Sequence, residues 1–142
     1  MFGLGKPKED VSNRSKEILK NAIQSTNVDT NDYTIVYGYF MKNGLMSKKM
    51  YNYAIGLSKD TSNMIIVQIG KNGSIGEIMH IETADIQNAK VNMQGIVVIK
   101  SNQGDIKFTV PPYTGSNAER TYQLPIVQEE ESDIIRSFIK SI

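Results

Sequence analysis

The chain has no cysteine and only one histidine among its 142 residues. The lack of cysteine excludes disulfides, thiolate nucleophiles and cysteine-based metal sites, so stability must come from packing and hydrogen bonding. A lone histidine leaves few partners for a catalytic nucleophile or a zinc site. His80 falls inside a predicted strand, where we expect a structural or surface role. We therefore predict no catalytic residues, no metal site and no cofactor.

Long apolar runs and a strong net charge are also absent. No run approaches the roughly 20 apolar residues that a membrane-spanning helix needs. The first residues are small and apolar, but Lys6, Lys8, Glu9 and Asp10 follow where a secretory signal would be apolar. We therefore predict an uncleaved, cytoplasmic protein. A formal net charge of +1 provides no global field, so we expect no nucleic-acid binding and only local electrostatic function.

Helical periodicity is present at both ends of the chain. An apolar stripe formed by Ile18, Leu19, Ala22 and Ile23 predicts a short helix from Val11 to Ser25, followed by a polar turn at 27–32. A second stripe, formed by Ile134, Ile135, Phe138, Ile139 and Ile142, predicts a helix from Gln128 to Ile142. Acidic residues at its start and basic residues near its end match the partial charges of the helix termini. The segment between Val110 and this helix is predicted to be a surface loop.

Between the helices, β-branched and aromatic residues alternate with a period of two, which favours strands. Seven strands are predicted, at 33–40, 51–58, 64–70, 76–82, 86–92, 95–101 and 105–110. Asn-Gly and Gln-Gly pairs between these runs favour tight hairpins, so we expect antiparallel pairing. Strands at this spacing predict a meander that curls into a barrel or into two packed sheets.

This element order resembles the pleckstrin-homology (PH) superfold. The resemblance rests on the segment 53–59 (YAIGLSK), on 78–81 (IMHI) running into 85–86, on the glycine-led strand 95–100 (GIVVIK), and on the closing helix. The chain is similar to bacterial PH-like proteins over residues 33–142. The resemblance implies a mainly β fold with α: a PH-like barrel of seven antiparallel strands capped by a C-terminal amphipathic helix. The expected organisation is a single domain, with an N-terminal arm and extra helix at 1–26 and the capped barrel at 27–142.

The segment from Tyr33 to Lys59 contains four lysines and no acidic residue. Three of them follow the first predicted strand, and the resemblance implies that basic residues in this loop bind anionic head groups, although the loop holds no arginine. The candidate ligand-binding or partner-binding residues are Lys42, Leu45, Met46, Lys48 and Lys49. A solvated loop without a ligand is the alternative.

Three classes of function remain open. The leading prediction is a non-catalytic interaction module that binds a protein partner or self-associates, with Ile18, Leu19, Ala22 and Ile23 as the candidate oligomer contact. The second is weak peripheral binding of an anionic lipid or small anion through the lysines. The third is an enzyme with dispersed polar residues, which would require a deep pocket with two convergent carboxylates or His80 facing one.

Overall fold

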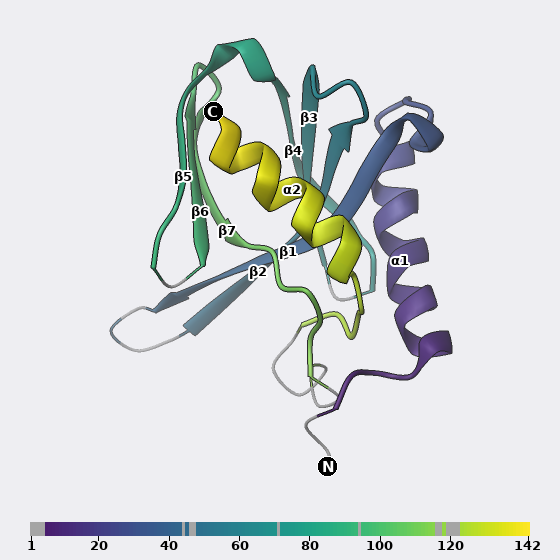
Figure 1. Ribbon diagram of the computed structural model, residues 1–142. Coiled ribbons are helices and arrows are strands. Elements are labelled where there is room, and N and C mark those ends of the chain that lie inside the picture. The colour runs from purple at the N-terminus through teal and green to yellow at the C-terminus, as the bar shows by residue number, and fades with distance from the viewer. Residues whose placement is uncertain are drawn as a thin grey trace.

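The chain folds as one antiparallel sheet with a helix on each side (Figure 1). The computed structural model describes residues 5–43, 45, 48–70, 72–93, 95–115, 118 and 123–142. The helices are α1 (Glu9–Gln24) and α2 (Glu129–Ser141). The strands are β1 (Tyr33–Asn43), β2 (Lys48–Ser58), β3 (Asn63–Ile69), β4 (Ile75–Glu82), β5 (Ile86–Val91), β6 (Ile96–Ser101) and β7 (Gly104–Thr109). The mainly β architecture with two helices is thus confirmed.

The strand order in the sheet is β4-β3-β2-β1-β7-β6-β5, which makes β4 and β5 its two edges. Within the described residues no ladder joins β4 to β5, so the predicted barrel is an open sheet rather than a closed one. Strands β1 to β4 and strands β5 to β7 are joined where β1 pairs with β7, at the single ladder position Tyr39↔Thr109. Glycines with positive φ occupy the turns at Gly73, Gly95 and Gly104, as the Asn-Gly and Gln-Gly pairs predict.

One core lies between the sheet and α2, and we call it the α2-side core. Ile135 and Ile139 of α2 are fully buried there. They pack with strand residues that point to the same side of the sheet, including Val36, Ile55, Leu57, Val97, Ile99 and Phe108. Phe138 is half-buried against this core, as expected of a capping helix. Ile134 and Ile142 of the predicted stripe are instead about half exposed, at 47% and 49%.

A second core lies on the opposite side of the sheet, under α1, and we call it the α1-side core. Leu19, Ala22 and Ile23 are at most 1% exposed, and they pack against residues of β1 to β3 that include Tyr37, Ala54, Ile65 and Val67. Gly56 allows this close approach, because a Cβ there would stand 3.3 Å from Ile23 Cδ1. The apolar stripe of α1 is therefore part of the core of its own chain. Burying three such side chains stabilises the fold by several kcal/mol, at ~1.5 to 3 kcal/mol for each large aliphatic group.

The segment between β7 and α2 differs from the predicted surface loop. Leu124 and Ile126 are buried in the α1-side core, and Thr114 is also buried. Gln128, only 1% exposed, ties this segment to β1: its Oε1 accepts from Tyr37 N at 2.7 Å, and its Nε2 donates to Tyr37 O at 2.9 Å and to Pro111 O at 2.8 Å. A side-chain amide thus satisfies both backbone groups of a β1 residue, as a neighbouring strand would.

Candidate functional site

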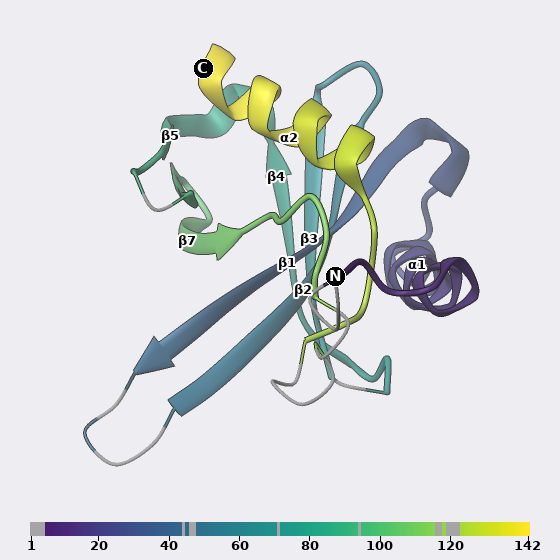
Figure 2. The ribbon, with the colours of Figure 1, turned by 60° about the horizontal axis from the view of Figure 1, so that its bottom comes forward.

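The distal part of the β1–β2 hairpin, residues 40–43 and 48–51, extends beyond the rest of the sheet (Figure 2). The ladder of β2 with β3 ends at Asn52↔Ile69, and that of β1 with β7 lies at Tyr39↔Thr109. Beyond those positions the two strands pair with each other alone in the described chain, from Phe40↔Tyr51 to Asn43↔Lys48. We call this projecting ribbon the basic hairpin.

The register of the basic hairpin places two lysines directly across from each other, at Lys42↔Lys49. Both side chains are exposed. Like charges on directly opposed strand residues repel and destabilise the pair, so this arrangement does not serve the stability of the hairpin. The lysines share their side of the hairpin with Phe40 and Tyr51, which are half-buried. The side of the hairpin that carries the lysines is therefore positively charged at its outer end and aromatic nearer the sheet.

Of the other predicted contact residues, Leu45 lies between the two strands of this hairpin and is fully exposed, at 106%. Lys48 is described for its backbone, which pairs with Asn43 in the ladder, and Met46 lies outside the described residues. The structure therefore brings Lys42, Lys49 and Leu45 to one projecting element.

The predicted oligomer contact is placed differently. Leu19, Ala22 and Ile23 are buried within their own chain, and Ile18 packs at the margin of the same core. The apolar stripe of α1 is thus covered by the sheet of the same molecule and presents little surface to a second copy.

A cleft of about 460 Å³ lies on the α2 side of the sheet, between β2 to β4 and the start of β7. It is lined by Tyr51, Tyr53, Ile66, Gln68, Glu77, Ile78, Met79, Gln103, Asp105 and Ile106. Two carboxylates line it, Glu77 from β4 and Asp105 from β7, and the described lining includes no basic residue. We call this hollow the acidic cleft.

The pKa of Tyr53 is affected by the charge of the acidic cleft. Burial raises the pKa of its phenol, and the neighbouring Tyr51 and the Glu77 carboxylate raise that pKa further. Glu77 and Asp105 are both exposed to water. The described lining thus places two exposed carboxylates beside two tyrosine rings, an arrangement that can recognise a cation.

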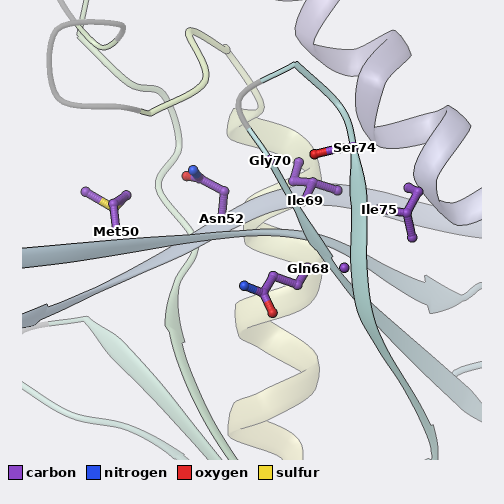
Figure 3. A pocket seen from close by; sticks show the side chains of 8 residues that line it. Met50, Asn52, Gln68, Ile69, Gly70, Ser74 and Ile75 are labelled. Atoms are coloured by element: carbon purple, nitrogen blue, oxygen red, sulfur yellow. The ribbon is translucent and has the colours of Figure 1, made fainter.

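A second hollow, of about 440 Å³, lies at the end of the β3–β4 hairpin (Figure 3). Figure 3 shows Met50 and Asn52 on one side of β2 and Gln68 on the other. The remaining lining residues are Ile69, Gly70, Ser74, Ile75 and Gly76. Among the described residues, the lining contains no charged side chain.

The other polar residues singled out by sequence do not form a catalytic constellation in the described part of the chain. His80 is exposed on β4 and does not line the acidic cleft. Asp60 caps the β2–β3 turn as predicted: its Oδ1 accepts from Ser62 Oγ at 2.6 Å and from Ser58 Oγ at 2.7 Å, which lowers the pKa of its carboxyl to about 2. No group of three potential ligand side chains that could hold a metal ion is present among the described residues.

Comparisons with protein-family models and with curated proteins find no match for this chain. In the described residues, neither helix is long and apolar enough to cross a membrane. Function must therefore be argued from the two charged features, the basic hairpin and the acidic cleft.

Sequence reasoning found the lysines because they cluster along the chain, but it missed Glu77 as a site residue. Glu77 and Asp105 lie far apart in sequence, in β4 and β7, and only the fold of the sheet brings them to one cleft. The alternation of Tyr51 and Tyr53 on one strand face was visible in the sequence and was the one available signal.

Proposed function

We propose that the protein is a non-catalytic binding module of the PH-like type whose basic hairpin attaches it to a membrane surface containing anionic lipid. The observation that carries the proposal is the projecting tip, where exposed Leu45 lies beside the opposed pair Lys42 and Lys49. The order of the strands and the packing of α2 on one side of the sheet support the PH-like assignment, although the sheet is open where the resemblance implied a closed barrel. The cytoplasmic location predicted from the sequence belongs to the same proposal.

An anionic surface resolves the repulsion within the hairpin. Each lysine near such a surface contributes about 1 kcal/mol. Leu45 adds ~2 kcal/mol if its side chain enters the interfacial region of the bilayer. The two lysines and Leu45 together therefore contribute ~4 kcal/mol of binding free energy, which corresponds to a dissociation constant of roughly 1 mM. Attachment of this strength is reversible and responds to salt.

The alternative in which the chain self-associates through α1 loses its motivation, because the stripe that suggested it is buried within the chain. An acidic protein remains a competing ligand for the lysines. It offers the carboxylates that Lys42 and Lys49 would contact, but it leaves the fully exposed Leu45 unexplained unless it also presents an apolar surface. The membrane accounts for both features.

Vesicle sedimentation tests the proposal. Vesicles of phosphatidylcholine with about one third phosphatidylserine should bind the protein at low salt, and binding should fall as salt rises because the charges are exposed. Lys42→Gln/Lys49→Gln should weaken binding roughly 30-fold, since it removes ~2 kcal/mol of attraction. Leu45→Ser should weaken binding at both low and high salt.

Lys90→Gln/Lys107→Gln is the matched control, because it removes the same charge from exposed positions on β5 and β7. Equal weakening by the hairpin variant and by this control would contradict the proposal, as would equal binding to vesicles of phosphatidylcholine alone.

A further inference from the structure

The described lining of the acidic cleft is negatively charged: it includes Glu77 and Asp105 and no lysine, arginine or histidine. The ion pairs of the described residues are Lys6–Glu129, Lys16–Glu131 and Arg136–Asp133, and none of them involves Glu77 or Asp105. Lys100 of β6 stands across from Asp105 in the ladder but does not line the cleft, whereas Glu77 has no opposed lysine in the described ladder of β3 with β4. Two carboxylates in one hollow whose described lining holds no cation attract a cationic ligand.

The rest of the lining suits a particular kind of cation. Tyr51 and Tyr53 lie on the same side of β2, and the rings of tyrosines attract cations placed over their faces. Ile66, Met79 and Ile106 provide apolar surface for the methylene groups of a long basic side chain. Gln68 and Gln103 add neutral hydrogen-bonding groups at the same hollow. An arginine or lysine side chain carries both a positive charge and methylene groups that can contact the apolar surface, whereas an inorganic cation has no apolar part.

One wall of the acidic cleft is β4, and β4 is an edge strand. In the described chain it pairs with β3 alone, so its outer backbone groups face away from the sheet. Ile75 and Ile78 are 44% and 45% exposed, which is high for isoleucines on a strand. Such an edge is a template for an added strand, with main-chain hydrogen bonds giving affinity and pockets for alternate side chains giving specificity.

The charge of β4 also indicates its partner. The strand has the sequence IGEIMHIE, with two glutamates and no lysine or arginine. The register shift between Val67 and Ile69 interrupts the ladder near Gly76, so the regular part of the edge is Ile78–Glu82. Glu77, Ile78 and Met79 connect this edge to the cleft, since all three line it.

We propose that the acidic cleft binds the basic side chain of an extended peptide segment that adds as a strand to the outer edge of β4. The backbone of the segment pairs with β4 along Ile78–Glu82. One side chain on its α2-facing side, arginine or lysine, enters the cleft between the tyrosines and the carboxylates. Tyr51, at the base of the basic hairpin, also lines the cleft, so the two sites adjoin, but Lys42, Lys49 and Leu45 are not among the residues that line it.

The test uses NMR titration of the full chain with three probes: the blocked pentapeptide Val-Thr-Arg-Thr-Val, the same peptide with neutral citrulline in place of arginine, and N-acetyl-arginine amide. The arginine peptide should give saturable shifts at Glu77–Glu82 and at 103–106. The citrulline peptide should bind about 10-fold more weakly, because it loses the interaction with the carboxylates and the rings. The single blocked arginine should be weaker than the pentapeptide by a similar factor, because it cannot pair with β4.

Variants of the protein test whether the cleft carboxylates cause the preference for the arginine peptide. Glu77→Gln/Asp105→Asn should abolish the preference for arginine over citrulline. Asp10→Asn/Glu17→Gln removes the same charge from exposed positions on α1 and should leave that preference intact. Lys42→Gln/Lys49→Gln should also leave it intact, so a failure of this inference is distinguishable from a failure of the membrane proposal.

The proposal is overturned if the arginine and citrulline peptides bind wild-type protein equally, or if no probe gives saturable shifts. If the single blocked arginine binds as tightly as the pentapeptide, strand addition is overturned and the cleft is a site for a free organic cation.

Discussion

The two halves of the β1–β2 hairpin have the same local structure but opposite surroundings. The proximal half, around Tyr37 and Ala54, is covered by α1 on one side and faces the α2-side core on the other. The distal half, residues 40–43 and 48–51, pairs only within the hairpin in the described chain and carries the exposed, opposed Lys42 and Lys49. Residues that stabilise the fold are therefore concentrated in the proximal half, whereas the distal half is available for binding at little cost in stability.

The largest effect is expected where the proximal half is tied to the C-terminal segment. Gln128→Ala should destabilise the protein by about 3 to 5 kcal/mol, because it leaves Tyr37 N, Tyr37 O and Pro111 O without their buried partner. Urea unfolding measures this change. Gln128→Glu is the comparison variant. It keeps an acceptor for Tyr37 N but loses the two bonds donated by Nε2, to Tyr37 O and Pro111 O. The free energy of unfolding of this variant should therefore also fall. If Gln128→Ala has the same free energy of unfolding as the wild type, the contacts of Gln128 do not stabilise the proximal half.

A smaller effect is expected at Gly38, at the inner end of the proximal half. A Cβ at this position would stand 2.5 Å from Ile55 Cδ1 and 3.4 Å from both Phe108 Cδ1 and Thr109 O. Gly38→Ala should therefore destabilise the protein by about 1 to 3 kcal/mol, as overpacking of a core does. Thermal unfolding measures it. Gly5→Ala is the control, because no atom lies within 4 Å of its Cβ position, and an equal loss in both variants would argue against crowding as the cause.

The smallest effect, and one of opposite sign, is expected in the distal half. Lys42→Gln removes one partner of the opposed pair Lys42↔Lys49 and should raise the free energy of unfolding by a few tenths of a kcal/mol. The increase should shrink at high salt, because both charges are exposed. Chemical unfolding at low and high salt measures this. A loss of stability comparable to that of Gly38→Ala would erase the distinction between the two halves.

The periodic patterns predicted the elements well but not their partners. All seven strands and both helices lie within three residues of their predicted bounds. The largest differences are at the distal half of the hairpin, because lysines and methionines there pair without the buried side that produces an alternating pattern. The stripe of α1 was correctly identified, but its place on the sheet was not, since a stripe does not specify which surface covers it.

Two further features lay beyond the reach of sequence. Residues 123–127 fall in the segment predicted as a loop, yet Leu124 and Ile126 are buried, as is Gln128 at the start of the predicted helix. Gln128 is stable there because the backbone of Tyr37 satisfies its amide, and that is a tertiary contact between residues far apart in the chain. The acidic cleft depends in the same way on the position of β7 relative to β4.

The single ladder position that joins β1 to β7 has a consequence for how the chain folds. Strands β1 to β4 form one run of hairpins and β5 to β7 form another, and every ladder within each run connects neighbours in sequence. Closing such short loops carries a small entropic cost, so each run can begin to form independently of the other. The pairing Tyr39↔Thr109 instead joins residues far apart in the chain, so it closes a much longer loop at a larger entropic cost.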